Sequence, residues 1–241
     1  MDCILLFLKA PEPGKVKTRL AKSIGGEDGF DIAAALYNCF VLDWCDRLHQ
    51  FCQPPSPGTI LRVLYSPPEA KTTVQQWLSV SNWGAGIGEQ LYPQAAGDLG
   101  DRLHQAFVAA FDAGAHRAIA VGTDSPDLPL ENLTQLFGNL DTHHCGLIPS
   151  TDGGYCAIGF HRDHYEPAVF QNMAWSTETV FADTLTQLRS HHHTISTLPP
   201  WTDVDNLDDL HVLMQQLQNP AIALQLPRTH HWLMANIALI P

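Results

Sequence analysis

The chain is predicted to fold as an α/β domain with a mostly parallel sheet flanked by helices. Short apolar runs of strand length alternate with longer segments whose apolar residues recur every three or four positions. The first apolar run, residues 3–8, shows no alternation of polar and apolar residues. Such a run is typical of a strand that is covered by helices on both faces, as in parallel sheets.

Six short apolar segments are predicted as strands, and four amphipathic segments are predicted as helices. The strands are residues 3–8, 60–65, 118–122, 146–149, 156–160 and 194–198. The helices include residues 33–48, 99–111, 180–188 and 207–217. The predicted N-caps are Ser176 or Thr177 for the third helix and Asp205 or Asn206 for the fourth. Residues 53–58, rich in proline, are predicted as a loop.

Composition indicates a globular protein and argues against two classes of partner. The 241 residues carry 13 Lys and Arg against 25 Asp and Glu, for a formal net charge of −12. This balance disfavours binding to nucleic acid or to an anionic membrane surface. No apolar run approaches the roughly 20 residues of a membrane span.

The amino terminus and the cysteines favour a cytoplasmic location. The first residues lack the basic segment and cleavage site of a signal peptide. The six cysteines form no C-x-x-C pair, which favours reduced thiols over disulfides. Three of them, Cys39, Cys45 and Cys52, are predicted to be small buried apolar residues of one helix.

One transferase domain is expected over residues 1–218, followed by a tail at 219–241. The tail ends in a short apolar run, residues 237–240. This run is expected to pack either on the domain or on a second copy of the chain, which leaves a homo-oligomer open.

A cluster of cations follows the first predicted strand. Five of the 13 Lys and Arg residues lie between positions 9 and 22, where uniform scatter would put about one. The turn that carries them contains Pro11, Pro13 and Gly14. Backbone N–H groups and a following helix N-terminus favour a phosphate there, although a solvated basic loop is the alternative. The cations are Lys9, Lys15, Lys17, Arg19 and Lys22.

Neither standard phosphate-loop pattern is present in this turn. The sequence lacks both G-x-x-x-x-G-K-[ST] and G-x-G-x-x-G. It also lacks the G-x-S-x-G element of serine hydrolases.

Asp124 follows the predicted strand 118–122, where ligands of open α/β sheets bind. A carboxylate that faces a phosphate site implies a divalent cation between the two anions. Asp124 and Asp127 are alternatively turn formers, with Pro129 opening a helix.

A second acidic group occurs near residue 205. Asp203 and Asp205 flank one residue, so both point to one face if the backbone is extended. Two carboxylates on one face need a compensating cation or proton, unless Asp205 is a helix cap. Asp208 and Asp209 belong to the first turn of the next helix and are interpreted as structural.

Three further motifs have both a functional and a structural interpretation. Residues 152–155 (Asp-Gly-Gly-Tyr) allow close backbone approach to a ligand, or form an ordinary tight turn. The same holds for Gly97-Asp-Leu-Gly-Asp-Arg-Leu103. Trp175 with the following hydroxyls contacts a ligand, or simply begins a helix.

The histidine runs do not have the spacing of a metal site. The runs at 143–144 and 191–193 consist of neighbouring residues rather than the i, i+4 pairs that share one helix face. They are predicted to be exposed loop ends.

Together these motifs resemble the bacterial CofC-like glycosyltransferase A family, labelled DUF2064. The resemblance spans about residues 3–212 and rests on six motifs in the expected order. They are Lys9-x-Pro-x-Pro-Gly-x-Val-Lys-Thr-Arg-Leu20, Gly97-Asp-Leu-Gly-x-Arg-Leu103, Gly122-Thr-Asp-Ser-Pro-Asp-Leu128, Asp152-Gly-Gly-Tyr155, Trp175-Ser-Thr177 and Asp203-Val-Asp205.

The resemblance implies a GT-A fold, a Rossmann-like three-layer α/β/α sandwich that holds a nucleotide and Mg²⁺ or Mn²⁺. The metal ligands it implies are Asp124, Asp203 and Asp205. The catalytic group it implies is Asp124, Lys17 and Arg19. The nucleotide and phosphate contacts it implies are Lys9, Pro13, Gly14, Lys15, Lys17, Arg19, Gly100 and Arg102. The acceptor contacts it implies are Asp152, Gly153, Gly154, Tyr155, Trp175 and Ser176.

Three functions are compatible with these motifs. The first is a metal-dependent glycosyltransferase that uses a nucleotide-sugar donor and a small-molecule acceptor. The alternative is a nucleotidyltransferase that passes a nucleoside monophosphate from a triphosphate to a small acceptor and releases pyrophosphate. A nucleotide-binding regulator without turnover is disfavoured, because a lapsed enzyme need not keep Asp124, Asp203 and Asp205.

Overall fold

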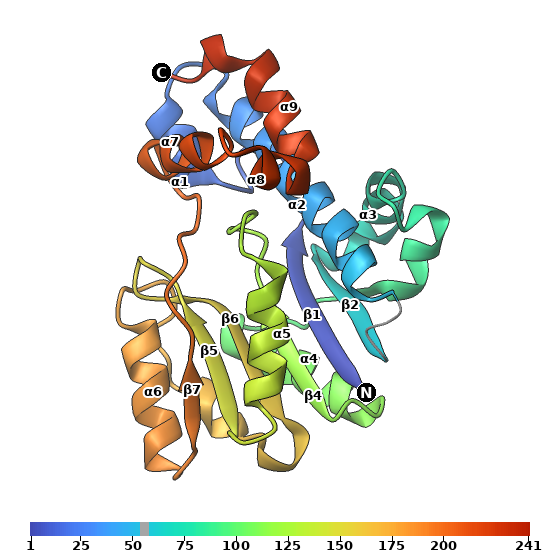
Figure 1. Cartoon of the computed structure of the whole chain (residues 1–241), viewed down its shortest axis with the longest axis vertical. Helices are drawn as coiled ribbons and strands as arrows, with labels where there is room; N and C mark the ends of the chain where they lie inside the picture. The colour runs from blue at the N-terminus through green and yellow to red at the C-terminus, as the bar shows by residue number, and fades with distance from the viewer. Residues whose placement is uncertain (54–57) are drawn as a thin grey trace.

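A seven-stranded sheet forms the centre of the computed structural model, which describes residues 1–53 and 58–241 (Figure 1). The strand order is β3-β2-β1-β4-β6-β5-β7. The strands are β1 (Asp2–Lys9), β2 (Thr59–Ser66), β3 (Leu91–Pro93), β4 (Arg117–Val121), β5 (Cys145–Pro149), β6 (Tyr155–His161) and β7 (Ile195–Thr197). Positions 54–57 of the predicted loop lie outside the described residues.

Strand β6 is antiparallel to both of its neighbours, β4 and β5, whereas the other neighbouring pairs are parallel. The prediction of a mostly parallel α/β sheet is therefore confirmed. Because β6 is reversed, its first residues lie at the edge where β1 and β4 end. Ala157 of β6 pairs with Val121, the last residue of β4.

Helices cover both faces of the sheet. They are α1 (Thr18–Ile24), α2 (Gly29–Phe51), α3 (Lys71–Leu78), α4 (Leu99–Asp112), α5 (Leu130–Asn139), α6 (Val180–Ser190), α7 (Leu207–Gln216), α8 (Pro220–Gln225) and α9 (Pro227–Ala235). Short 3₁₀ turns span Pro68–Ala70, Gly84–Gln90, Arg162–His164, Pro167–Phe170 and Ile237–Leu239. Residues of α2, α3 and α5 share one core cluster, and residues of α4 and α6 share the other. The fold is thus a three-layer sandwich.

The central position of β1 in the sheet explains why its sequence shows no alternation of polar and apolar residues. Ile4, Leu6 and Leu8 belong to one core cluster, whereas Cys3 and Leu5 belong to the cluster on the opposite face. None of these five side chains is more than 2% exposed. A central strand that is buried on both faces has no polar side chain to place outward.

The carboxyl-terminal residues pack on the domain. Figure 1 shows α7, α8 and α9 together with α1 beyond the ends of β1 and β4. Leu226 and Leu233 share a third core cluster with residues of α1, α2 and α7. The buried Asp43 of α2 accepts hydrogen bonds from the backbone N–H groups of Arg228 and Thr229, at 3.1 and 2.9 Å. These bonds satisfy N–H groups that a helix N-terminus otherwise leaves unpaired.

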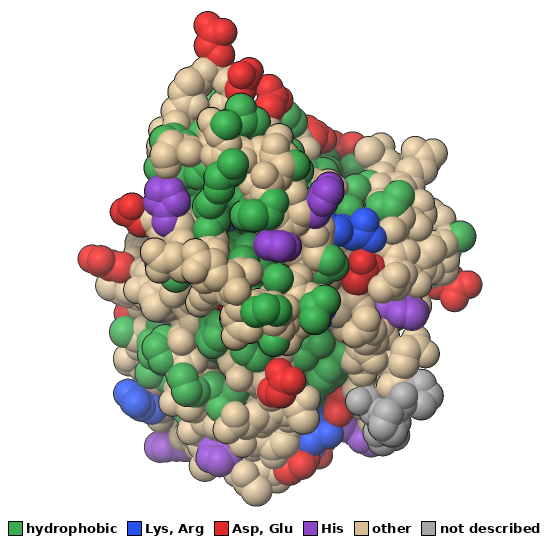
Figure 2. All heavy atoms as spheres, turned by 45° about the horizontal axis from the view of Figure 1, so that its top comes forward, with side chains coloured by type: hydrophobic (Ala, Val, Ile, Leu, Met, Phe, Trp, Pro, Cys, Tyr) green, Lys and Arg blue, Asp and Glu red, His purple; other side chains and the backbone are tan. Residues whose placement is uncertain are grey.

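Other hydrophobic side chains of the same region stay at the surface. Figure 2 shows hydrophobic side chains on the face that carries the carboxyl-terminal helices. The most exposed large ones there are Leu224, Met234 and Ile237. None of the helices in residues 1–53 and 58–241 combines the length and apolar character needed to cross a membrane.

All six predicted strands and all four predicted helices are present, with small shifts in their ends. Strand β3 and helices α1, α3, α8 and α9 were not predicted, and α5 was raised only in the alternative that Pro129 opens a helix. Asn206 caps α7 through a reciprocal capping box with Asp209. Of the two predicted N-caps, Asp205 and Asn206, the second is therefore confirmed. The cap predicted for α6 is wrong, because Thr179 occupies the N-cap and Ser176 has a left-handed φ of 65°.

Candidate active site

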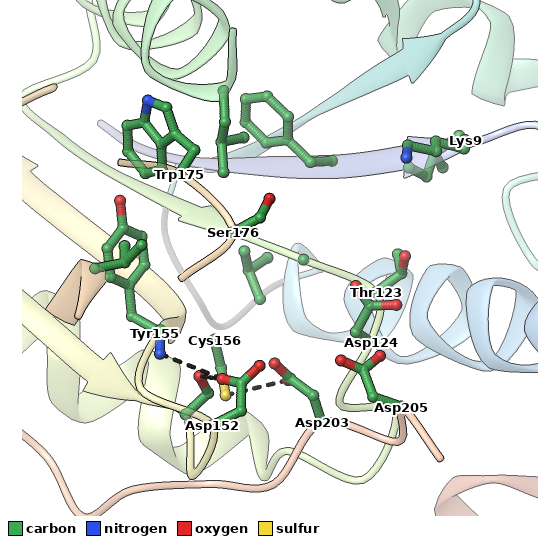
Figure 3. A pocket seen from close by; sticks show the side chains of 18 of the residues that line it. Lys9, Thr123, Asp124, Asp152, Tyr155, Cys156, Trp175, Ser176, Asp203 and Asp205 are labelled. Atoms are coloured by element: carbon green, nitrogen blue, oxygen red, sulfur yellow. Dashed lines mark hydrogen bonds between the residues drawn. The ribbon is translucent and has the colours of Figure 1, made fainter. Parts of the chain in front are cut away.

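A pocket of about 1120 Å³ opens at the carboxyl ends of β1 and β4 (Figure 3). This is the position at which open α/β sheets bind ligands. Five cations and five carboxylates line it. The cations are Lys9, Lys15, Lys17, Arg19 and Arg102, and the carboxylates belong to Asp124, Asp152, Glu178, Asp203 and Asp205. Basic and acidic motifs that are distant in the sequence therefore share one pocket.

A backbone hydrogen bond joins the two acidic segments. The N–H of Val204 donates to the carbonyl oxygen of Asp124 at 2.9 Å. The bond fixes the extended stretch around Val204 against the end of β4, so Asp203 and Asp205 lie beside Asp124. Figure 3 shows the three carboxylates on the same side of the pocket.

Lys17 is the central cation of this group. Its Nζ forms an ion pair with Asp124 and lies 3.1 Å from Oδ1 of Asp205, and its side chain is 2% exposed. Burial alone lowers the pKa of Lys17, but Asp124 and Asp205 outweigh it and raise the pKa above its usual value. The ammonium group therefore stays charged.

The backbone of Lys17 is unusual as well. Lys17 is the N-cap of α1 and has φ 46° and ψ 42°, the left-handed conformation. For a residue other than glycine this conformation costs on the order of 1–2 kcal/mol. The ion pairs of the side chain offset that cost.

Arg19 forms the second link between cations and carboxylates. Its guanidinium pairs with Asp205 and lies 3.8 Å from Asp152. The Arg19 side chain is 69% exposed and faces solvent at the pocket. Because Asn206 caps α7, the side chain of Asp205 is left free for Lys17 and Arg19.

Asp203 is the most buried of the carboxylates near β4. Ser125 donates a hydrogen bond to its Oδ1, and the Cys156 thiol lies 3.4 Å from the same oxygen. Burial, and then the negative charge of Asp124, raise the pKa of Asp203 to about 6.

Tyr37 supports the site from helix α2. Its hydroxyl oxygen accepts hydrogen bonds from the Lys9 backbone N–H and the Thr123 hydroxyl, both at 3.0 Å. Burial, and then the charge of Asp124, raise its pKa to about 12. This role was not predictable from the sequence, because Tyr37 belongs to the apolar stripe of its helix.

Residues of the segment 150–155 form another part of the pocket wall, namely Ser150, Asp152, Gly154 and Tyr155. Asp152 accepts hydrogen bonds from the Ser150 hydroxyl and the Gly154 N–H, the latter at 3.2 Å. Burial raises the pKa of Asp152, but Ser150, Gly154 and Arg19 together outweigh it and hold the pKa below its usual value. Asp152 is therefore an anion that faces the pocket.

The far end of the pocket is aromatic and apolar. Figure 3 shows Trp175 and Tyr155 at this end and Asp124 and Asp205 at the other, with Ser176 between them. Phe7 and Leu103 also line this end. The Trp175 indole N–H is buried and has no hydrogen-bond partner in the described part of the chain.

Four predicted contact residues lie outside the pocket lining, namely Pro13, Gly14, Gly100 and Gly153. Packing explains two of them. A Cβ on Gly100 would lie 2.5 Å from the carbonyl oxygen of Phe170, and one on Gly153 would lie 2.0 Å from that of Glu178. At these two positions the close approach of the neighbouring chain by itself requires glycine. Gly14 supplies a turn with φ 75° beside the exposed Pro13.

Several pocket residues were missed in the sequence, among them Tyr37, Gln94, Thr123, Cys156 and Glu178. Gln94 donates from Nε2 to the carbonyls of Leu8 and Leu64, at 2.9 and 2.8 Å. Thr123 precedes Asp124 and Cys156 follows Tyr155, so proximity to these predicted residues could have indicated both.

The carboxylates suit a divalent cation by their chemistry. Mg²⁺ and Mn²⁺ prefer oxygen ligands. Asp124 is 52% exposed and pairs through one oxygen, and Oδ2 of Asp203 stays available. Among residues 1–53 and 58–241, however, no three His, Cys, Asp or Glu side chains are already arranged to hold a metal. Lys17 and Arg19 occupy Asp205 instead.

The histidine runs lie away from this pocket and are only in part exposed. His144 stacks on His164 with ring centroids 3.8 Å apart, and His193 meets His144 edge-on at 5.3 Å. His144 and His193 are half-buried, so the prediction of exposed loop ends holds for His191 and His192 alone.

The six cysteines are free, and all but Cys52 are buried. Cys39 and Cys45 lie in α2 and Cys52 is its C-cap. Their predicted use as small apolar residues of one helix is confirmed for the first two.

Solved structures with the same fold were found. A protein from Desulfovibrio desulfuricans G20, named provisionally as a nucleotide-diphospho-sugar transferase, is 33% identical. The match covers 99% of this chain and 96% of that one, with a TM-score of 0.84. A cytidylyltransferase from Leptospira borgpetersenii is 11% identical, with coverage of 99% and 96% and a TM-score of 0.52.

A 4-diphosphocytidyl-2C-methyl-D-erythritol synthase from Anaerococcus prevotii is 10% identical, with coverage of 90% and 98% and a TM-score of 0.52. At such identities the likeness concerns the fold alone. No curated protein matched the chain.

The family model described as "Uncharacterized protein conserved in bacteria (DUF2064)" matches residues 56–177. This match covers half of the chain, and it includes Asp124, Asp152 and Trp175. The chain belongs to the DUF2064 family.

Proposed function

We propose that this protein is a transferase that binds an activated nucleotide, with a nucleotide sugar as its donor and a small molecule as its acceptor. The observation that carries the proposal is the single pocket in which four aspartates stand beside five cations at the carboxyl ends of β1 and β4. The 33% identical protein that is named as a nucleotide-diphospho-sugar transferase supports the same class.

The cations suit the phosphates of the donor. Lys9 and Lys15 are exposed at the pocket, and Arg102 lines it from helix α4. Lys and Arg form charge-assisted hydrogen bonds to phosphate oxygens. Lys17 and Arg19 line the same pocket and pair with the aspartates, so phosphates bound by these cations would lie near the carboxylates.

The aspartates suit a divalent cation. Asp124 and Asp203, with Asp205, would hold Mg²⁺ or Mn²⁺. Bound there, the cation would supply positive charge against the negative charge that develops on the departing phosphate.

The acceptor would enter from the side of Asp152 and Trp175. Asp152 is an anion, so it can accept a hydrogen bond from an acceptor hydroxyl and orient it. Ser176 and Tyr155 line the same side. In this arrangement the hydroxyl attacks the sugar carbon, and the nucleoside diphosphate leaves toward Lys17 and Arg19.

A nucleotidyltransferase is the second candidate. The five cations of the pocket suit a triphosphate somewhat better than a diphosphate. In that reaction the acceptor attacks the α-phosphorus and pyrophosphate departs.

One experiment separates the two candidates. Purified protein with Mn²⁺ is offered nucleotide sugars labelled in the sugar, and in parallel nucleoside triphosphates labelled at the γ-phosphate, each with a panel of small alcohols. Label transferred from sugars supports the first, and labelled pyrophosphate supports the second. Both candidates fail if neither product appears with any donor and Asp124→Ala binds Mn²⁺ and nucleotide as tightly as the wild type.

Three expectations stay predictions. The six free thiols favour a cytoplasmic location. The exposed hydrophobic side chains of the carboxyl-terminal helices are compatible with a homo-oligomer. The boundary between a domain at 1–218 and a tail at 219–241 also stays a prediction; Leu226 and Leu233 beyond it share a core cluster with residues of α1 and α2.

A further inference from the structure

Lys17 occupies carboxylate oxygens that a divalent cation would need. Its Nζ pairs with Oδ1 of Asp124 and lies 3.1 Å from Oδ1 of Asp205. The Lys17 side chain is only 2% exposed, so solvent screens these contacts less than it screens ion pairs at the surface. Both aspartates belong to the set proposed above to hold the metal, and the inference therefore rests on that proposed function.

We propose that Lys17 is the resident counter-ion of the aspartate cluster and is displaced from it when metal and nucleotide bind. In this role Lys17 keeps the affinity for metal alone low. It then becomes a phosphate contact once a nucleotide is present.

The cluster needs a cation in the absence of any ligand. The hydrogen bond from Val204 to Asp124 holds Asp124, Asp203 and Asp205 together. Like charges at such short range repel one another strongly away from bulk water. Lys17 supplies the compensating charge from within the chain, and Arg19 adds a second, more exposed one at Asp205.

Lys17 and a metal exclude each other from the same oxygens. While Lys17 is paired, its ammonium partly neutralises the carboxylates and so weakens their attraction for the metal. The ammonium also repels the metal directly. The left-handed backbone at Lys17 aims the side chain at the cluster. The neighbouring Val16 and Leu20 are buried and hold this backbone in place.

Phosphate offers Lys17 a new partner. Asp124 is 52% exposed toward the pocket, so a phosphate bound there comes within reach of the ammonium. Binding of nucleotide then relieves the competition, and metal and nucleotide strengthen each other's binding by the same factor.

The test is a calorimetric titration of MnCl₂ into protein without nucleotide. Lys17→Gln is expected to bind Mn²⁺ roughly tenfold or more tightly than the wild type, because the competing charge is gone. Lys22→Gln is the matched control, since Lys22 is exposed, lies outside the pocket and makes no ion pair within residues 1–53 and 58–241. Its affinity for Mn²⁺ is expected to equal that of the wild type.

The second arm uses a nucleoside diphosphate in the presence of Mn²⁺, chosen as the one that gives the largest thermal shift with the wild type. Lys17→Gln is expected to bind it roughly tenfold more weakly. Opposite changes in the two affinities distinguish a displaced counter-ion from a simple phosphate contact. A Lys17→Gln variant whose affinity for Mn²⁺ alone is unchanged or weaker overturns the inference.

A variant that does not fold without metal is still informative. If Lys17→Gln is unfolded by circular dichroism, Mn²⁺ is expected to restore the fold, whereas NaCl of equal ionic strength is not. Failure of Mn²⁺ to do so overturns the inference. None of these readouts needs turnover, so absence of transfer with every donor would end the proposed function and leave this result standing.

Discussion

The backbone N–H of Val204 donates a 2.9 Å hydrogen bond to the carbonyl oxygen of Asp124, 80 positions earlier in the chain. Through this contact the segment before α7 is attached to the end of β4. The side chain of Asp124 takes no part in this bond and faces the pocket, where it pairs with Lys17. The contact therefore separates the structural role of Asp124 from its chemical one.

Replacing Asp124 by alanine is expected to abolish metal-dependent nucleotide binding and to leave the fold intact. The reason is that the carbonyl that holds Val204 is retained, while a carboxylate proposed to hold the metal is lost. Calorimetry with Mn²⁺ and nucleotide measures the first effect and thermal unfolding the second. Asp208→Ala, an exposed acidic residue of α7, is the control. Unchanged nucleotide affinity in Asp124→Ala would remove this residue from the site.

Replacing Arg19 by alanine is expected to weaken phosphate binding by about 1.5–3 kcal/mol, the range for a hydrogen bond to a charged group. Arg19 is 69% exposed, so the loss should appear in nucleotide affinity and hardly in stability. Titration of wild type and variant with the same nucleotide gives both numbers. Lys22→Ala, on the exposed side of α1 and outside the pocket, should bind like the wild type.

The strands could be predicted from the sequence because a strand that is buried on both faces must consist of apolar residues. Residues 3–8 are apolar without alternation, and both faces of β1 are buried. Strand β3 was missed because three residues are too few to show a strand periodicity. Helix α1 was missed because it is only seven residues long and about half of them are polar. Such elements are specified by their neighbours rather than by their own periodicity.

The sequence motifs predicted which residues belong to the candidate site, but not how those residues contact one another. Asp124 and Asp203 stand in recognisable motifs at the ends of predicted elements. The pairing of Lys17 with two aspartates was not predictable, since it depends on a left-handed backbone at a lysine. For Gly100 and Gly153 the sequence cannot separate two causes, because close packing of a neighbouring chain and close approach of a ligand both require glycine.

Arg47 is expected to be essential for stability. It is 5% exposed and donates to the carbonyl oxygens of Pro126 and Leu128, in the loop that follows Asp124. Arg47→Met leaves both carbonyls without these donors, at a cost of about 2–5 kcal/mol. Urea denaturation measures the loss. Arg189→Met, at an exposed position of α6, should cost less than about 0.5 kcal/mol. Equal midpoints for the two variants would contradict this role.

The histidines near His144 are expected to make the fold sensitive to acid. Burial, and then the neighbouring His164, His143 and His161, lower the pKa of His144. Burial and His144 likewise lower that of His193, although Glu166 opposes the shift. The unfolded chain therefore binds protons more readily than the folded one.

Stability from these groups is complete above the unfolded pKa of about 6.5 and is lost as the pH falls below it. The free energy of unfolding of wild type and His144→Gln, measured between pH 8 and pH 5 in roughly half-unit steps, tests this. The variant should show the shallower decline on acidification. A steeper decline in the variant would reverse the sign and refute the assignment.

Gly153 is expected to tolerate no side chain, because of the chain that crosses it. It has φ 93°, and an added Cβ would lie 2.0 Å from the carbonyl oxygen of Glu178. Gly114 has nearly the same φ, 94°, with nothing within 4 Å of its Cβ position. Gly114→Ala therefore reports backbone strain alone, on the order of 1–3 kcal/mol.

Gly153→Ala must in addition displace residues 175–178, which carry Trp175 and Ser176. Its loss of stability should clearly exceed that of Gly114→Ala in urea denaturation, and its tryptophan fluorescence should change. Equal losses would mean that residues 175–178 yield freely and are not held against Gly153.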